Sequence, residues 1–563
     1  MLNRDAPNVI PELVRQHAVR NPDAVFCTFL ANGAEEEITF GAFYRGGCAY
    51  AREFLRRGVA VGDVVPIILQ HSPHLFYSFL GTMLTGAIPT FMPFPSAKQR
   101  ADLYWRDHET LFARLCPRLI VTYAENLAAA NALPGFSIET LLADDDLLDV
   151  TIDMEDRLPG LTGSPADVAC LQHSSGTTGL KKGVMLTHMA ILDQLAAYSQ
   201  AIGLLPSDRI ASWLPLYHDM GFIACFMMPI VTGTQLVSLD AFEWTLRPSI
   251  LLDAIQRYAA TLCWLPNFAF SHIVKTARPS AKYDLSSMRA FINCSEPCKP
   301  QTLRRFRDRF SESGLKAASL QVCYAMAENV FAVTQTDLND TPTVIELDAD
   351  MFSHDRVQVT GKGSGAQEVL SCGRLVSGTQ GRICDSQGNA SPPDTVGEIH
   401  ITSEFLFSGY YLQPEITEKK LRNGWYATGD LGFFHAGELY VTGRVDDMIV
   451  LNGRNYYAHD IEDLVNSVAG VIPGRSIAIG IDDQASDATV LVVLVEHRGL
   501  PDEGIQLARS IKGEILAHLG LAAYSVVALR SGSLLKTTSG KISRVKNKDF
   551  YLQGAFQSIP VET

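Results

Sequence analysis

The chain has 563 residues, of which 47% are hydrophobic and 19% charged, a composition typical of a folded globular protein and not of a disordered one. That length exceeds what one hydrophobic core supports, so we expect two to four domains. The formal net charge of −14 argues against nucleic acid or an anionic membrane surface as the main partner, while it leaves room for a local basic pocket that holds a nucleotide.

The cysteines and the N-terminus indicate the compartment. The eleven cysteines are odd in number and form no C-x-x-C pair, which predicts a reduced, intracellular protein without a zinc site. The first residues lack the apolar core of a secretory signal. The most apolar window, residues 221–239, contains Pro229 and Gly233 and is more typical of a protein core than of a membrane span. We therefore expect a soluble, cytoplasmic protein.

Predicted helices and strands alternate through the first half of the chain. A helix from Pro11 is followed by a strand over residues 24–30 and by a helix over residues 40–55, for which Thr39 is the N-cap. Further strands are predicted at residues 64–69, 117–122, 209–215, 235–239 and 288–294, and a helix at residues 74–90. Strands that alternate with helices predict an α/β fold with a largely parallel sheet.

The pattern changes after about residue 370. Between residues 371 and 443, apolar and polar residues alternate between glycine turns, which predicts a small, antiparallel, barrel-like β subdomain. A new α/β pattern begins at Asp446. We therefore predict an N-terminal domain over residues 1–443 and a small α+β C-terminal domain over residues 446–563. The polar residues 336–366 predict a partly ordered insertion.

The segment Leu171-Gln-His-Ser-Ser-Gly-Thr-Thr-Gly-Leu-Lys-Lys-Gly-Val184 indicates a phosphate-binding loop. Glycines let the backbone approach an oxyanion, and successive N–H groups and hydroxyls can surround phosphate oxygens. Lys182 adds a point charge for the same anion. The loop G-x-x-x-x-G-K-[ST] of kinases and GTPases does not fit, because Lys181 occupies a position that needs glycine. A plain surface turn is the alternative for this segment taken by itself.

Four later segments carry residues suited to nucleotide chemistry. Tyr324-Ala-Met-Ala-Glu328 combines an aromatic ring that can stack on a purine with a carboxylate that can hold Mg²⁺. Asp430, at the end of Tyr-Ala-Thr-Gly-Asp, is suited to accept hydrogen bonds from two ribose hydroxyls. Arg444 can fork onto ribose or phosphate, and Lys541 is a cation in a glycine- and serine-rich loop. Taken singly, these segments are also an ordinary helix start, a Gly-Asp turn and a solvated loop.

In this order, the five segments resemble the motifs of the adenylate-forming superfamily, which includes acyl-CoA synthetases, firefly luciferases and peptide-synthetase adenylation domains. The resemblance spans nearly the whole chain. It implies a large N-terminal domain, a small mobile C-terminal domain and a hinge at Asp446 between them. It also implies ATP and Mg²⁺ as cofactors.

The resemblance implies a role for each matching residue. The ATP phosphates would be held by Ser174, Ser175, Gly176, Thr177, Thr178, Gly179 and Lys182. Adenine would contact Ser295, Glu296, Tyr324, Ala325 and Met326. Glu328 matches the Mg²⁺ ligand, Asp430 the ribose ligand and Arg444 a further nucleotide contact. The expected catalytic set is Lys541, Glu328, His218 and Thr177.

Several segments are similar to one branch of the superfamily, the fatty acyl-AMP ligases, among them Trp213–Gly221 and Pro266–Phe270. This similarity implies an acyl pocket at Trp213, His218, Trp264 and Leu265. Trp264 and Leu265 stand where these ligases tend to have small residues, so we expect acids shorter than the long-chain ones. His218 would orient the acid or gate the pocket. The alternatives are a buried, hydrogen-bonded histidine and a Trp264 that packs in the core.

The implied reaction joins a carboxylic acid to the α-phosphorus of ATP and releases pyrophosphate. An acid of ordinary pKa is already ionised at neutral pH, so catalysis asks for positioning and charge neutralisation. The expected acceptor of the acyl group is the phosphopantetheine of an acyl carrier protein. The alternatives are an acyl-CoA ligase, a stand-alone amino-acid adenylation enzyme and a non-catalytic nucleotide-binding protein.

Overall fold

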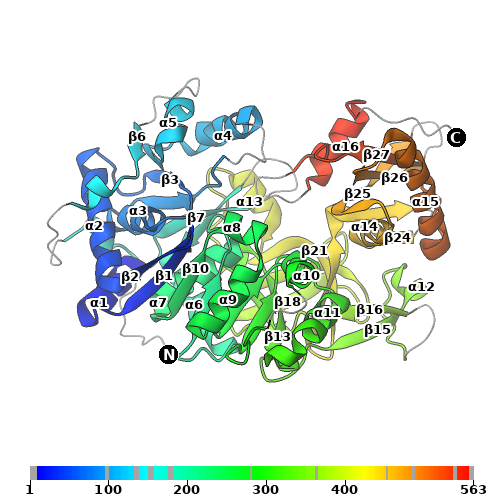
Figure 1. The fold of residues 1–563 in the computed structure, drawn as a ribbon, viewed down its shortest axis with the longest axis horizontal. Helices are drawn as coiled ribbons and strands as arrows, with labels where there is room; N and C mark the ends of the chain where they lie inside the picture. Colours follow the sequence, from blue (N-terminus) through cyan, green and yellow to red (C-terminus); the bar gives the residue numbers. More distant parts are fainter. Residues whose placement is uncertain are drawn as a thin grey trace.

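A nine-stranded sheet and a four-stranded sheet form the large N-terminal part of the molecule (Figure 1). The computed structural model describes residues 9–95, 101–131, 139–149, 157–174, 182–278, 282–361, 366–451, 454–483, 488–536 and 542–556. The nine strands lie in the order β17 (Arg374–Leu375), β14 (Ala332–Gln335), β13 (Leu320–Ala325), β12 (Ala290–Asn293), β11 (Leu262–Leu265), β9 (Arg209–Ser212), β10 (Gln235–Leu239), β1 (Val25–Ala31) and β2 (Ala34–Thr39). The strands from β13 to β1 are parallel, and antiparallel strands extend both edges. The predicted α/β class is confirmed.

The second sheet is parallel throughout, in the order β4 (Ile88–Phe91), β3 (Val64–Ile68), β5 (Leu119–Thr122) and β6 (Glu139–Leu142). The helices of this half are α1 (Ile10–Arg20), α2 (Phe40–Arg56), α3 (Pro73–Leu84), α4 (Ala101–Leu115), α5 (Ala124–Asn131), α6 (His188–Ala201), α7 (Met228–Thr232), α8 (Ala241–Leu246), α9 (Ser249–Tyr258), α10 (Asn267–Thr276) and α11 (Pro300–Phe310). Strands β3 and β5 are completely buried, as parallel strands covered on both faces are.

Helix α2 begins where the sequence predicts and packs closely on α3. The Thr39 hydroxyl accepts a hydrogen bond from the Ala42 N–H at 3.1 Å, which caps the helix. A Cβ atom at Gly47 would lie 2.7 Å from the Leu80 side chain, and one at Gly81 would lie 2.5 Å from Cβ of Tyr50. Glycine at these two positions therefore permits the close crossing of the helices.

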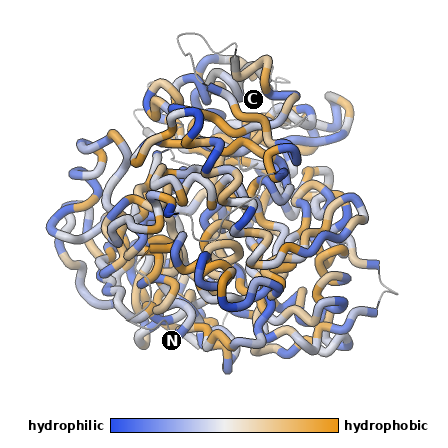
Figure 2. The backbone as a smooth tube through the Cα atoms, turned by 90° about the vertical axis from the view of Figure 1, so that its left-hand side faces the viewer, coloured by the Kyte–Doolittle hydropathy of each residue, from blue (hydrophilic) through white to orange (hydrophobic). Residues whose placement is uncertain are grey.

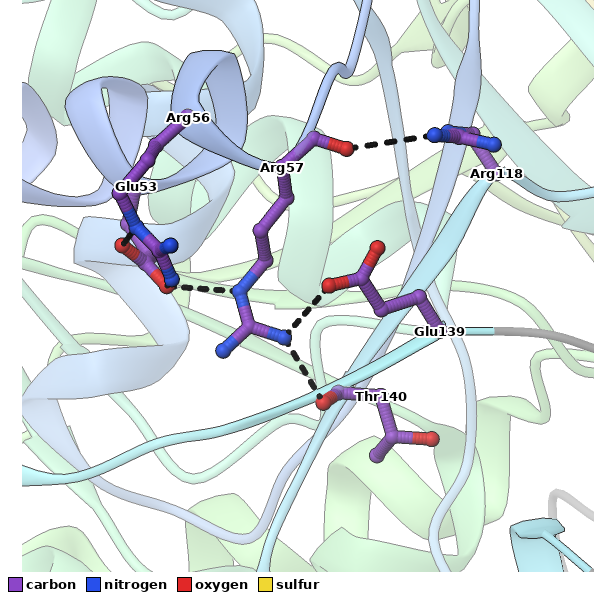
Figure 3. A network of polar contacts seen from close by, with 6 residues as sticks. All are labelled: Glu53, Arg56, Arg57, Arg118, Glu139 and Thr140. Carbon is purple, nitrogen blue, oxygen red and sulfur yellow. Dashed lines mark hydrogen bonds and ion pairs between the residues drawn. The ribbon is translucent and has the colours of Figure 1, made fainter.

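Arg57, directly after α2, ties that helix to the four-stranded sheet (Figure 3). Its guanidinium donates to Glu53 at 2.6 Å within its own helical segment, and to Glu139 at 2.9 Å on β6. Its carbonyl accepts a hydrogen bond from Arg118 at 3.4 Å. The side chain and the carbonyl of this one residue thus fix where α2 ends relative to β6 and to the start of β5.

The β-rich region is a five-stranded antiparallel sheet, as predicted. Its strands are β18 (Thr379–Cys384), β19 (Gly397–Ser403), β21 (Trp425–His435), β20 (Leu421–Arg422) and β22 (Glu438–Arg444), which pairs with β21. The short helix α13 (Pro414–Lys420) precedes β20. The segment predicted as an insertion forms the antiparallel pair β15 (Val344–Asp348) and β16 (Ala366–Leu370) with helix α12 (Ala349–Phe352) between them.

The C-terminal part has hydrophobic clusters of its own. It contains β23 (Met448–Leu451), β24 (Arg454–Tyr457), α14 (Ala458–Ser467), β25 (Val471–Asp483), β26 (Ala488–His497), α15 (Pro501–Leu519), β27 (Ser525–Arg530) and α16 (Arg544–Leu552). Two clusters of buried side chains lie wholly within residues 449–556. In Figure 2, hydrophobic stretches lie between hydrophilic ones both near the C-terminus and in the rest of the chain. The domain boundary that we propose at residues 443–446 falls at the end of β22.

Two details differ from the sequence expectations. The segment from Tyr324 to Glu328 is no helix start: β13 ends at Ala325 and a short 3₁₀ turn, Ala327–Asn329, follows. The helix expected over residues 74–90 ends at Leu84, because β4 begins at Ile88. Among the helices of the described ranges, none combines the length and the apolar character that crossing a membrane requires.

Candidate active site

The glycine loop connects two paired strands. Strand β7 (Val168–Ser174) ends at the loop and β8 (Lys182–Thr187) begins directly after it, with Ser174 and Lys182 opposite each other in the antiparallel pair. The predicted loop residues Ser175, Gly176, Thr177, Thr178 and Gly179 lie outside the described residues, and so does Lys541.

Lys182 lies beside the carboxylate predicted to hold Mg²⁺. Its Nζ lies 5.1 Å from the centre of the Tyr410 ring, and the Tyr410 hydroxyl donates a hydrogen bond of 2.7 Å to Oε1 of Glu328. Burial lowers the pKa of Lys182, and the negative charge of Glu328 opposes that shift. Backbone hydrogen bonds from Met185 to Gly409 and from Ser408 to Met185, both of 3.0 Å, hold β8 against the segment that carries Tyr410.

The backbone after Glu328 is strained. Val330 has φ 62° and ψ −56°, and the Phe331 N–H donates to the Asn329 carbonyl at 2.6 Å, which closes a γ-turn around Val330. A positive φ is rare for a β-branched residue and costs about 1–3 kcal/mol. The Glu328 carbonyl also accepts from the Phe407 N–H at 2.9 Å. The main chain at Glu328 and directly after it is therefore fixed.

Asp430 and Arg444, predicted to contact the nucleotide, lie opposite each other on β21 and β22. Arg444 Nε lies 3.0 Å from Oδ1 of Asp430, and the Tyr324 hydroxyl donates to Oδ2 at 2.6 Å. Burial raises the pKa of Asp430, and the nearby Arg444 charge opposes that shift. A carboxylate has about four lone-pair directions, so Asp430 keeps acceptor capacity for hydroxyl groups of a ligand.

Tyr426 connects these two groups of residues. Its hydroxyl lies 3.1 Å from that of Tyr410, and it stands on β21, four residues before Asp430. Tyr410 therefore contacts Lys182, Glu328 and Tyr426, and Tyr426 stands on the same strand as Asp430. Neither Tyr410 nor Tyr426 was expected as a site residue, because the contact between Tyr410 and Glu328 that places them joins residues 82 positions apart in the sequence.

The residues expected around adenine have two kinds of environment. Tyr324, Ala325 and Met326 are partly exposed at the end of β13, and the Met326 N–H donates to the Phe331 carbonyl at 2.9 Å. Glu296 instead accepts a hydrogen bond of 3.0 Å from the Phe268 N–H in the first turn of α10. Ser295 has φ 69°, an unusual value for serine. The contact of Glu296 is that of a helix cap.

His218 stands at the start of a buried π-helix, Met220–Met227. Its Nδ1 lies 2.7 Å from Oδ1 of Asp219, and that oxygen also accepts from the Met220 N–H at 2.8 Å. The His218 side chain is 27% exposed and therefore only partly buried. The π-helix is a rare conformation, and its single-turn form is often found at functional sites.

Of the four residues expected at the acyl pocket, Trp213 lines an apolar cavity. Trp213 stacks on Trp244 at 3.6 Å between ring centres and lines a small apolar cavity of about 50 Å³ at the ends of β3, β4, β9 and β10. The residues that line this cavity do not include His218, Trp264 or Leu265. Trp264 is completely buried, and its indole N–H donates to the Tyr198 hydroxyl at 2.9 Å.

The proposed hinge residue Asp446 lies in a short 3₁₀ turn, Val445–Asp447, between β22 and β23. On the C-terminal side, Lys536 and Ile542 form an antiparallel bridge. The buried Asn547 side chain donates to the carbonyls of Leu535 at 2.8 Å and Ser543 at 2.7 Å. The two chain segments that flank Lys541 in the sequence are therefore held together.

Comparisons with known proteins agree with this arrangement. A long-chain-fatty-acid–AMP ligase of Mycobacterium marinum, FadD26, is 28% identical, with 98% of each chain covered. A putative ligase of Mycobacterium tuberculosis is also 28% identical, covering 90% of this chain and 94% of its own.

Solved structures resemble the whole chain. One from a study of the fatty acyl-adenylate ligases of E. coli and L. pneumophila has a TM-score of 0.89 at 26% identity over 98% of each chain. The L. pneumophila enzyme in complex with acyl adenylate and pyrophosphate has a TM-score of 0.74 at 26% identity, covering 97% of this chain and 96% of its own. The family model described as AMP-binding enzyme matches residues 14–411, most of the chain. The chain therefore belongs to the AMP-binding enzyme family.

Proposed function

We propose that this adenylate-forming enzyme activates a fatty or related carboxylic acid with ATP, releases pyrophosphate and passes the acyl group to the phosphopantetheine of an acyl carrier protein. The observation that carries the first step is the convergence of Lys182, Glu328, Asp430 and Arg444 next to the strands that flank the glycine loop. The likeness to chains named as fatty acyl-AMP ligases supports the acid class.

Each residue of the site has a role in this reaction. Asp430 accepts hydrogen bonds from the ribose hydroxyls, and Tyr324 and Arg444 hold its carboxylate in place. Lys182 neutralises phosphate charge as pyrophosphate leaves, and Lys541 supplies charge at the attacking carboxylate and the bridging oxygen. The carboxylate attacks the α-phosphorus in line, so the protein contributes positioning and electrostatic stabilisation and transfers no proton.

The carboxylate of Glu328 fits a Mg²⁺ ion. Mg²⁺ in nucleotide sites is usually bound by one or two carboxylates together with substrate phosphates and water. Among the described residues there is no group of three His, Cys, Asp or Glu side chains that could bind a metal ion. When bound, the ion would withdraw charge from the phosphate oxygens. Tyr410 orients Glu328 for this task through its hydrogen bond.

The acceptor distinguishes this proposal from that of a CoA ligase. The experiment is pyrophosphate release over a panel of carboxylic acids, followed by addition of CoA or of a phosphopantetheinylated carrier protein. We expect acid-dependent pyrophosphate release and acyl transfer to the carrier protein. Thioester formation with CoA would assign the enzyme to the CoA ligases, and pyrophosphate release with amino acids alone would assign it to the amino-acid adenylation enzymes.

A further inference from the structure

Arg544 joins three elements of the C-terminal part. Its Nη2 donates to Oε1 of Glu462 on α14 at 2.6 Å, its Nε donates to the Ala478 carbonyl on β25 at 3.2 Å, and its Nη1 forms an ion pair with Asp447. A guanidinium directs its donors in a rigid planar fork, so three partners in three directions fix the side chain. A lysine ammonium could not reach all three.

The pair with Glu462 stabilises the domain itself. Oε1 of Glu462 also accepts from the Ala478 N–H at 2.9 Å, and burial raises the pKa of Glu462 while the Arg544 charge opposes that shift. A buried carboxylate without a cationic partner is strongly destabilising. Arg544, the first residue of α16, is therefore held firmly against α14 and β25.

The pair with Asp447 has a different consequence. Asp447 is the last residue of the turn Val445–Asp447, directly after the proposed hinge residue Asp446. The Asp447 side chain is 28% exposed and that of Glu462 is 17% exposed. Water can therefore solvate the Asp447 carboxylate in addition to its pairing with Arg544. The pair attaches the end of the turn to the body of the C-terminal part.

We propose that the Asp447–Arg544 pair positions the C-terminal domain for the reaction, with Arg544 as a positioning residue that touches no substrate. This inference rests on the proposed function. The pair makes Asp447 part of the rigid C-terminal body, so rotation between the domains is confined to residues 444–446. Arg544 also follows Lys541 by three residues in the sequence.

The test compares the two half-reactions in Asp447→Asn. This variant removes the charge at the hinge and leaves the Arg544–Glu462 pair intact. We expect the kcat of pyrophosphate release to change about 10-fold or more relative to the rate of acyl transfer from preformed acyl-adenylate, with KM for ATP within about two-fold of the parent value. Because Arg544 keeps its contacts with Glu462 and the Ala478 carbonyl in this variant, Tm should move by only a few degrees.

Two further variants separate positioning from folding. Asp447→Glu keeps the charge and should restore the ratio of the two half-reactions. Glu514→Gln removes a pair with His518 on α15 of the same domain and should leave that ratio at the parent value. If Asp447→Asn lowers both half-reactions equally, or lowers neither, the inference is wrong.

Hydrogen exchange tests the role of the Asp447–Arg544 pair without measuring enzyme activity, so its result does not depend on the proposed function. The Met448 N–H donates to the Val445 carbonyl at the end of the hinge turn. Hydrogen exchange of the backbone amides 446–448 should be faster in Asp447→Asn and unchanged in Glu514→Gln. Unchanged exchange in Asp447→Asn would overturn the positioning role even if the parent adenylates no acid. Failure of the parent to release pyrophosphate with any acid would instead contradict the proposed function.

Discussion

The Tyr410 hydroxyl donates a hydrogen bond of 2.7 Å to the carboxylate of Glu328, and the ring of the same tyrosine lies under the ammonium of Lys182. One residue thus holds the two charged groups that the proposed reaction brings to the phosphates of ATP. Tyr410→Phe keeps the ring and removes the donor, so it tests the hydrogen bond alone. We expect acid-dependent pyrophosphate release to fall about 10-fold and to need more Mg²⁺ for half-maximal rate.

Tyr411 supplies the matched control for that variant. It is the next residue, it is partly exposed, and its ring packs in a different hydrophobic cluster. Tyr411→Phe should retain the Mg²⁺ dependence of the parent. An unchanged Mg²⁺ dependence in Tyr410→Phe would show that the hydrogen bond does not orient Glu328 for catalysis.

Lys541→Ala should reduce adenylate formation by about 10²-fold or more, because a single well-placed cation in a charge-stabilising site has an effect of this size. The thermal midpoint should stay close to that of the parent. The measurement is pyrophosphate release under saturating acid and ATP. A variant that retains a rate within a few-fold of the parent would remove Lys541 from the catalytic set.

The contact between His188 and Ile10 predicts a pH effect on stability. The Ile10 N–H, at the start of α1, donates to Nδ1 of His188 at 3.3 Å, and burial lowers the pKa of His188 to about 4. Because the folded pKa lies below the unfolded value of about 6.5, this contribution is fully present above pH 6.5 and is lost as pH falls toward 4. At about 1.4 kcal/mol per unit, the loss amounts to about 3 kcal/mol.

His188→Gln removes the titrating group and retains an acceptor for the Ile10 N–H. Its thermal midpoint should fall less than that of the parent between pH 7 and pH 4.5. His272→Gln, at a partly exposed histidine on α10, should keep the pH dependence of the parent. If the thermal midpoints of His188→Gln and the parent fall equally with pH, His188 is not the group that causes the pH dependence.

A substitution at Trp264 tests whether the protein prefers acids shorter than sixteen carbons. The indole is completely buried and its N–H is hydrogen-bonded to Tyr198, so it occupies its volume rigidly. If that volume closes the acyl pocket, medium-length acids are better substrates than sixteen-carbon acids, and Trp264→Gly shifts the optimum toward longer chains. If Trp264 only packs in the core, the substitution lowers Tm and leaves the ranking of the acids unchanged.

The sequence predicts the helices and strands well where interactions between residues close in the sequence determine them. Thr39 caps α2, buried apolar runs form parallel strands, and alternation between glycines forms the antiparallel sheet. Residues such as Asp430 and Arg444 carry motif signals, and the pairing of β21 with β22 brings them together.

Features that depend on contacts between residues far apart in the chain could not be predicted from the sequence pattern. Tyr410 reaches Glu328 across 82 residues, and no local pattern marks it. Trp264 and Leu265 were both expected at the acyl pocket, and as neighbours on β11 they pack in different hydrophobic clusters on the two faces of the sheet. Alternation along a strand could have predicted that separation.

The most direct test of the central claim is acid-dependent pyrophosphate release by the full-length protein with ATP and Mg²⁺, with the acyl-adenylate identified by mass spectrometry. The account predicts release that requires a carboxylic acid and an adenylate of matching mass. It also predicts that Asp430→Asn, which weakens the acceptor for the ribose hydroxyls, raises KM for ATP. ATP binding without pyrophosphate release over a broad panel of acids would contradict the account and would indicate a non-catalytic nucleotide-binding protein.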